Sequence, residues 1–268
     1  MPREIPRLGL GTYQMTGREE CASAVETAIE TGYRHVDTAQ AYGNETHVAE
    51  GIDRAGTDRE DCFVATKLST ENLGYDDAVR TARESADRLG VDTIDLLYVH
   101  WPLRTYDPEA TLAALDDLVD DGVVDAIGLS NFTPALLTDA IDRLEAPLLA
   151  HQVECHPLFP QAELRELAVE HDHWLVAYSP LARGRVLDVP EVRAVAEKHD
   201  ATPAQVSLAW LRSKDEVVAI PKASSHDHVR ENYASLEVEL DDEDVARIDA
   251  IPADRYERVI DFESAPWH

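Results

Sequence analysis

The middle of the chain reads IDLLYVH (94–100), PEATLAALDDLVDD (108–121) and VVDAIG (123–128). The two outer segments are short apolar runs rich in β-branched residues, which is typical of β-strands. The segment between them has the apolar spacing of an amphipathic helix, and Gly122 follows it, where a helix end favours a residue without a Cβ. Together the three segments predict a strand, a helix and a second strand, which is a βαβ unit.

The same alternation continues along the chain in both directions. It gives eight βα units without a Pro/Gly/Ser-rich linker, so the sequence predicts an α/β protein with one (β/α)8 TIM barrel domain spanning 1–268. A doubly wound open sheet is the alternative. The expected strands are 7–10, 34–37, 62–67, 94–100, 123–128, 148–154, 174–179 and 217–220. The expected helices are 19–31, 45–55, 75–89, 108–121, 133–144, 161–171, 190–211 and 226–235.

Both ends of the chain depart from the repeat. The segment before the first strand is short, so most of an N-terminal hairpin closing the barrel bottom is missing. An amphipathic segment at 241–251 and a tail to 268 follow the eighth unit. We expect an extra C-terminal helix and a tail that lie across the outside or the rim of the barrel.

The charge is strongly acidic, with 53 Asp and Glu against 24 Lys and Arg and a net charge of −29. This balance makes nucleic acid an improbable partner. Self-repulsion of such a surface destabilises a compact chain unless salt screens it, so we expect a halophilic protein in a salt-rich cytoplasm. The scarcity of lysine, with four lysines beside twenty arginines, supports this view. A merely acidic surface in ordinary salt is the alternative.

Composition also indicates in which compartment the protein works and how it assembles. No apolar run is long enough for a membrane span, and the first residues lack the pattern of a secretory signal, so we expect a cytoplasmic protein without a membrane partner. The three cysteines show no CxxC spacing, which predicts neither a disulfide framework nor a metal site. We expect a monomer.

Polar residues end several of the apolar runs, and in a (β/α)8 barrel the chemistry sits at the carboxyl ends of the strands. Asp37 and Lys67 could form a pair at one rim, because a buried lysine needs a partner. A cation near Tyr42 would favour its ionised form and make it a better proton donor, while His100 could hold a carbonyl oxygen. These groups predict proton delivery to a carbonyl that accepts a hydride. Taken singly, each residue is more often a solvated loop or structural residue.

Eight segments resemble, in order, the signature segments of the aldo-keto reductases. The resemblance covers nearly the whole chain. Within the family, the chain is similar to bacterial and archaeal 2,5-diketo-gluconate-reductase-like members. The resemblance implies a (β/α)8 barrel that reduces aldehydes or ketones with NAD(P)H, and a catalytic tetrad of Asp37, Tyr42, Lys67 and His100 with Tyr42 as general acid. The segments are LGLGT (8–12), GYRHVDTAQAYGNE (32–45), VATK (64–67), LLYVHWP (96–102), GLSNF (128–132), QVECHP (152–157), AYSPLARG (177–184) and IPKASS (220–225).

The resemblance also implies the residues around the nicotinamide and the pyrophosphate. Ser130, Asn131 and Gln152 would hold the carboxamide of the nicotinamide. The ring of Tyr178 would stack on one nicotinamide face, which leaves the other face for hydride transfer. The residues along the pyrophosphate would be Thr12, Ser179 and Leu181.

The adenine end can be argued from the residues themselves. Lys222 precedes 224–227, an [ST]xxD capping pattern that opens the eighth helix, and a lysine beside a helix start suits a ribose 2′-phosphate. NADPH is therefore the preferred cofactor. Ala223 and His228 depart from the family pattern, so NADH use is possible. The residues expected at this end are Lys222, Ser224, Ser225, His228, Glu231 and Asn232.

Short loops bear on the substrate. Few residues separate HWP (100–102) from its helix, and the tail DFESAPWH (261–268) is brief, so we expect an open pocket with Tyr13 and Trp101 as aromatic walls. Such a mouth suits small aldehydes, α-dicarbonyls and keto-sugars.

Three other interpretations compete with this one. The pairs His171/His173 and His226/His228 could indicate a metal hydrolase, but their positions favour surface residues and no metal. The glycines of LGLGT lack the third glycine of a dinucleotide-binding fingerprint. A nicotinamide-nucleotide-binding sensor with little turnover would keep the fold and the cofactor, and only the intact tetrad argues against it.

Overall fold

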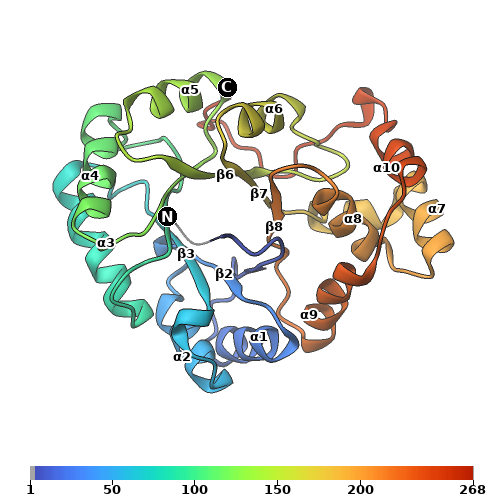
Figure 1. Cartoon of the computed structure of the whole chain (residues 1–268), viewed down its shortest axis with the longest axis horizontal. Helices are drawn as coiled ribbons and strands as arrows, with labels where there is room; N and C mark the ends of the chain where they lie inside the picture. Colours follow the sequence, from blue (N-terminus) through green and yellow to red (C-terminus); the bar gives the residue numbers. More distant parts are fainter. Residues whose placement is uncertain (1–3, 268) are drawn as a thin grey trace.

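The computed structural model describes residues 4–267, and its centre is an eight-stranded parallel sheet (Figure 1). The strands follow one another in chain order around the sheet, as the repeated βα pattern predicts. Each pairs in parallel with the next, for example Lys67 with Tyr98 and Ser130 with Gln152. The strands are β1 Leu10–Gly11, β2 His35–Asp37, β3 Phe63–Leu68, β4 Leu96–Val99, β5 Ile127–Ser130, β6 Leu148–Glu154, β7 Trp174–Tyr178 and β8 Val217–Ala219.

The sheet closes on itself between its first and last strands. Leu8 forms a parallel bridge with Ala219, and Gly11 forms one with Lys222. The amide of Gly9 also donates to the carbonyl of Ala219 over 2.9 Å. The expected (β/α)8 barrel is confirmed, and the open doubly wound sheet is wrong. The first strand is shorter than expected and begins later, since regular pairing with β2 starts only at Leu10.

Helices surround the barrel, as Figure 1 shows. One expectation about them was wrong: the segment 190–211 is two helices, not one. Asp200 ends the first helix with a φ of 50°, and Thr202 starts the second through a capping box with Gln205. Pro203 then occupies the first turn, where a missing N–H costs nothing. The helices are α1 Arg18–Thr31, α2 Glu45–Ala55, α3 Tyr75–Leu89, α4 Pro108–Asp120, α5 Pro134–Arg143, α6 Ala162–Glu170, α7 Pro190–His199, α8 Pro203–Arg212, α9 His226–Tyr233 and α10 Asp242–Asp249.

Side chains alternate between two apolar layers because successive strand residues point to opposite faces. One layer lies between the strands and the helices, and the other fills the inside of the barrel. Ile5, from the short N-terminal segment, belongs to the inner layer. The buried residues of the inner layer are Ile5, Phe63, Ala65, Leu96, Tyr98, Ala126, Ala150, Val176, Val218 and Ile220.

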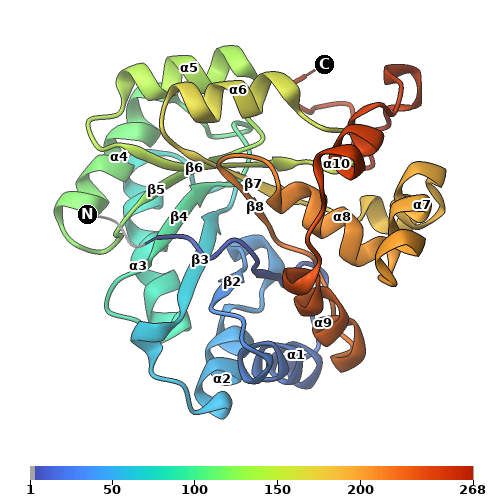
Figure 2. The ribbon, with the colours of Figure 1, turned by 45° about the vertical axis from the view of Figure 1, so that its right-hand side comes forward.

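The C-terminal region packs on the outside of the barrel, as expected. The extra helix α10 lies beside α7 at the edge of the molecule (Figure 2). Trp210 of α8 donates to Asp249 over 2.8 Å, and Lys198 of α7 pairs with Asp244 over 2.8 Å. Within residues 4–267 no helix is long and apolar enough to cross a membrane.

Candidate active site

The polar groups of the site stand directly above the inner apolar layer. Four of them, Lys67, His100, Gln152 and Tyr178, follow a residue of the inner layer by two positions, so the two-residue period turns them toward the barrel axis. Lys67 follows Ala65 on β3, and Tyr178 follows Val176 on β7. Strand geometry therefore brings together groups that are far apart in sequence. The inward polar residues at this level are Asp37, Lys67, His100, Ser130, Gln152 and Tyr178.

Asp37 and Lys67 form the buried ion pair that their positions predict. Lys67 Nζ donates to one Asp37 carboxylate oxygen and, over 2.7 Å, to the carbonyl oxygen of Thr38. The second oxygen of Asp37 accepts a hydrogen bond from Gln152 Nε2 over 2.7 Å. Burial lowers the pKa of Lys67, whereas the charge of Asp37 acts in the opposite direction. The pair is thus a fixed, fully hydrogen-bonded dipole at the floor of the site.

Tyr42 lies on the short 3₁₀ turn Gln40–Tyr42, which follows β2. Its ring is 5.2 Å from Lys67 Nζ. The expected direction of its pKa shift was wrong: burial first, and then the negative charge of Asp37, raise the pKa of Tyr42 well above its usual value. Burial is the largest cause, so the nearby Lys67 does not bring the pKa of Tyr42 down. The phenol therefore keeps its proton throughout the neutral pH range.

His100 follows β4, and its ring meets the Tyr42 ring edge-on at 5.6 Å between centroids. Burial and the positive charge of Lys67 lower the pKa of His100 to about 3, so the imidazole is neutral. A neutral imidazole carries one N–H donor. Among residues 4–267, neither the His100 ring nor the Tyr42 hydroxyl has a hydrogen-bond partner. Two polar groups are therefore free to bind the same incoming atom.

These groups open into a cavity of about 400 Å³. Twelve of the residues expected from the sequence line it, and Lys67 stands beneath them. They are Thr12, Tyr13, Asp37, Tyr42, His100, Trp101, Ser130, Asn131, Gln152, Tyr178, Ser179 and Lys222. Of the other expected residues, Leu181, Ser224, Ser225, His228, Glu231 and Asn232 do not line it.

Sequence reasoning missed six residues that line the cavity, and the tail supplies two of them. Ile260 and Phe262 reach the cavity from the chain end, and Phe262 packs edge-on against Trp101 at 4.9 Å between ring centroids. On this side the mouth has a wall that the sequence did not predict, because the tail supplies these two side chains. The only sequence signal was the presence of two aromatic residues in an otherwise polar tail. The missed residues are Gly11, Ala41, Arg183, Ile220, Ile260 and Phe262.

The histidine pairs do not form a metal centre. Among residues 4–267 no group of three His, Cys, Asp or Glu side chains could hold a metal ion. His226 and His228 are exposed, as expected, but His173 is buried and its pKa is lowered to about 4 by burial. The surface location expected for His173 was wrong, because the chain enters β7 directly after it.

Comparison with known proteins agrees with this geometry. The sequence profile of the Aldo/keto reductase family matches residues 7–253. The chain belongs to the aldo/keto reductase family. An aldo-keto reductase of Mycolicibacterium smegmatis is 39% identical over 245 residues, which is 91% of this chain and 88% of that protein.

Other relatives agree in both sequence and fold. A glyoxal reductase of Bacillus subtilis is 38% identical over 251 residues, 94% of this chain and 90% of its own length. A crystal structure assigned as a 2,5-diketo-D-gluconic acid reductase B superposes with a TM-score of 0.93 at 32% identity, covering 97% of this chain and 92% of that one. Family membership supports the expected reduction of carbonyl groups with a nicotinamide cofactor.

The donor set of this aldo/keto reductase fits a nicotinamide carboxamide. Asn131 has a φ of 64° and lines the cavity with Ser130 and Gln152. Its Nδ2 donates to Ser130 Oγ over 3.0 Å, and its Oδ1 accepts from the Tyr178 hydroxyl over 2.8 Å. Gln152 Nε2 keeps one hydrogen beyond its bond to Asp37, and Asn131 Oδ1 keeps a second lone pair, so this set can donate to a carboxamide and accept from it.

The backbones of β1 and of the segment after β8 approach closely beside the cavity. A Cβ built at Gly11 would lie 2.8 Å from the carbonyl oxygen of Ile220, so only glycine allows the two chains to approach there. The loop after β7 is strained in the same region, with positive φ at Ser179 (47°) and Arg183 (52°). Strain of this kind concentrates at ligand sites.

The adenine end is organised differently from the capping pattern expected at 224–227. Ser225, not Ser224, caps α9, and its hydroxyl accepts from the amide of His228 over 3.2 Å. Ser224 Oγ instead lies 3.2 Å from Lys222 Nζ. The cap lies one residue later than expected because α9 begins at His226, so Ser225 is the residue directly before the helix. Of the two expected adenine contacts, Asn232 is buried and Glu231 is half-buried.

Proposed function

We propose that this chain reduces small aldehydes, α-dicarbonyls or keto-sugars to alcohols, with NADPH as the preferred cofactor. The observation that carries the proposal is the cavity wall formed by Tyr42 and His100, two polar side chains that have no hydrogen-bond partner within residues 4–267 and lie above a buried ion pair. When bound, the reduced nicotinamide supplies a hydride to the carbonyl carbon. The name of the Bacillus subtilis relative, glyoxal reductase, supports α-dicarbonyls as substrates.

The side chains of this protein would hold and transfer the proton that the carbonyl oxygen receives. The N–H of His100 binds the carbonyl oxygen and orients it toward the Tyr42 hydroxyl. Because the pKa of Tyr42 is raised, the phenol gives up its proton only when negative charge develops on that oxygen. Lys67, 5.2 Å from the Tyr42 ring, then stabilises the phenolate by its positive charge, and Asp37 holds Lys67 in place.

The proton donor can be tested by Tyr42→Phe. We expect kcat to fall by roughly a hundredfold or more, the usual scale for general acid catalysis, while the Kd for NADPH stays the same. Loss of absorbance at 340 nm with a panel of glyoxals, aromatic aldehydes and keto-acids measures kcat, and fluorescence titration measures Kd. Tyr75→Phe on the outer helix α3 is the matched control. Full activity of Tyr42→Phe would remove this residue from the mechanism. A wild type that binds NADPH but reduces nothing in the panel would instead favour a sensor.

The cofactor preference rests on Lys222. Its ammonium group, together with the start of α9, suits the 2′-phosphate of NADPH. We expect kcat/KM to be higher for NADPH than for NADH, and Lys222→Met to reduce that ratio by about tenfold, the scale of one charge-assisted hydrogen bond. Equal ratios of kcat/KM for NADPH and NADH in the wild type and in Lys222→Met would show that Lys222 does not distinguish the two cofactors by their 2′-phosphate.

We also propose a monomer that works in a salt-rich cytoplasm. The net charge of −29 supports the setting, since such a surface needs screening. Light scattering in molar KCl tests the monomer.

A further inference from the structure

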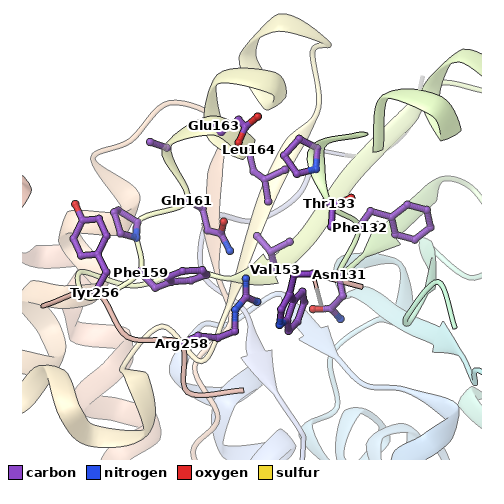
Figure 3. A pocket seen from close by; sticks show the side chains of 14 residues that line it. Asn131, Phe132, Thr133, Val153, Phe159, Gln161, Glu163, Leu164, Tyr256 and Arg258 are labelled. Atoms are coloured by element: carbon purple, nitrogen blue, oxygen red, sulfur yellow. The ribbon is translucent and has the colours of Figure 1, made fainter. Parts of the chain in front are cut away.

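The tail segment, residues 257–267, separates two cavities. Ile260 and Phe262 face the catalytic cavity, and Tyr256, Arg258 and Trp267 line a second cavity of about 350 Å³ on the other side. Figure 3 shows this second cavity between Tyr256 and Arg258 on one side and Val153 and Asn131 on the other. Since open space lies behind it, close packing alone does not hold the tail segment against the catalytic cavity.

One buried carboxylate fixes the tail segment. Glu154 is the last residue of β6 and is fully buried. Its Oε1 accepts from the amide of Val259 over 2.6 Å, and its Oε2 accepts from the amide of Ile260 over 2.8 Å. Both oxygens therefore bind consecutive backbone amides of a segment about a hundred residues away in sequence.

The carboxylate is itself oriented from below. His156 Nε2 lies 3.0 Å from Glu154 Oε1, and since an ionised carboxylate only accepts, this nitrogen must carry the proton. A glutamine could not replace Glu154 here without loss. It has one acceptor oxygen, and its NH₂ group would face an N–H donor. The site thus requires an acceptor on both side-chain oxygens.

Other contacts attach the tail segment at two further places and at the turn after β6. Phe262 and Trp267 pack on Trp101, with ring centroids 4.9 and 5.5 Å away, and the Glu257 side chain pairs with Arg185. The amide of Glu257 donates to the carbonyl of Leu158 over 2.8 Å. The guanidinium of Arg258 lies 4.4 Å from the Phe159 ring centroid and 3.5 Å from that of Trp267. Attraction between the positive charge and the ring faces holds this part of the tail on the turn.

We propose that Glu154 is a positioning residue that fixes the tail segment over the catalytic cavity, and thereby sets the KM for carbonyl compounds with an apolar substituent. The effect on KM rests on the proposed function. Glu154 does not line the catalytic cavity, so it acts through Ile260 and Phe262. Loosening the two amides lets these side chains move away from the substrate, whereas Tyr42 and His100 keep their places in the segments that follow β2 and β4.

Kinetics of Glu154→Gln test the proposal. We expect KM for an aromatic aldehyde to rise about tenfold, the scale of one lost hydrogen bond to a charged acceptor, with kcat within about twofold of wild type. Glu163→Gln, which removes a carboxylate from the wall of the second cavity, is the matched control and should leave both constants unchanged. Glu154→Asp keeps the charge but is too short to reach both amides, so it should behave like Glu154→Gln. Because Glu154→Asp is a second variant, the kinetic test can still be made if Glu154→Gln fails to fold.

A double-mutant cycle separates positioning from a general loss of structure. If Glu154 acts through the tail, Phe262→Ala should raise KM in the wild type and have little further effect in Glu154→Gln. Effects that simply multiply would overturn the proposal.

Limited proteolysis gives a readout that needs no activity. Trypsin cleavage after Arg258 should be about tenfold faster in Glu154→Gln than in wild type or Glu163→Gln, because opening of the tail exposes the bond. Equal cleavage rates would show that Glu154 does not hold the tail. A wild type without reductase activity would contradict the proposed function only, since the cleavage result would still stand.

Discussion

At the residue scale, burial determines which group in the site carries the mobile proton. The Tyr42 ring lies 5.2 Å from Lys67 Nζ and 5.6 Å from the His100 ring centroid, yet the pKa values of the three groups shift in different directions. Burial disfavours the charged form in each case, so it raises the pKa of the phenol and lowers those of the amine and the imidazole. His100 is therefore a neutral hydrogen-bond donor, and the Tyr42 hydroxyl is the group that retains a transferable proton.

This assignment predicts the pH profile of the reaction. Because the pKa of His100 is lowered to about 3 and that of Tyr42 is raised, neither group changes protonation between pH 5 and 9. We expect kcat/KM for reduction of an uncharged aldehyde to be flat over that range, with no step near 6.5, the ordinary pKa of histidine. Stopped-flow or steady-state rates in constant ionic strength measure this. A step near 6.5 that disappears in His100→Gln would contradict the neutral imidazole.

At the element scale, one glycine sets the distance between two helices. Gly51 of α2 packs on α1, and a Cβ built there would lie 2.6 Å from both the carbonyl oxygen of Ala22 and the Cβ of Val25. Backbone atoms and a β-branched side chain cannot move away from the added Cβ without a cost in free energy. The α2 helix begins three residues after Tyr42, so its close packing also anchors the turn that carries this residue.

We expect Gly51→Ala to destabilise the fold by about 1–3 kcal/mol, the usual cost of overpacking. Urea unfolding measures the change. Gly74→Ala is the control, since a Cβ at Gly74 meets nothing within 4 Å and its φ is −64°, and it should cost less than about 1 kcal/mol. Equal losses from the two substitutions would mean that the spacing of α1 and α2 is not tight.

At the scale of the whole molecule, the net charge of −29 sets how stability depends on salt. Many exposed carboxylates repel one another over distances that salt screens, whereas the buried pair of Asp37 and Lys67 is screened much less. We expect the free energy of unfolding to rise by on the order of 1–3 kcal/mol between 0.1 and 3 M KCl. Urea titrations at several KCl concentrations test this, and maximal stability in low salt would contradict a halophilic protein.

Buried histidines predict how the protein responds to acid. Burial lowers the pKa of His35 and His173 to about 4 and that of His151 to about 3, whereas in the unfolded chain each titrates near 6.5. Unfolding therefore takes up protons between these values, and stability falls as the pH is lowered from 7 to 5, by about 1–2 kcal/mol for each histidine.

Urea unfolding at each pH in 3 M KCl, which suppresses the general charge effect, measures this slope. His151→Gln should make the slope shallower, whereas His228→Gln on the exposed start of α9 should not. An unchanged slope in His151→Gln would show that His151 is not protonated on unfolding.

The sequence by itself predicted the barrel, which the structure confirms, and the polar groups that meet at its mouth. Both follow from local patterns: the alternation of apolar strands and amphipathic helices fixes the fold class, and polar residues two positions beyond inward apolar ones, such as Lys67 after Ala65, must reach the mouth. Local sequence signals also gave two wrong predictions. They joined 190–211 into one helix and placed the α9 cap one residue early.

Only the tertiary structure decided the direction of the Tyr42 pKa shift and the placement of the tail beside the pocket. The pKa depends on burial and on charges from several strands, which no single segment encodes. The position of Phe262 depends on two hydrogen bonds between its neighbours and Glu154, and such long-range contacts leave no periodic trace in the sequence.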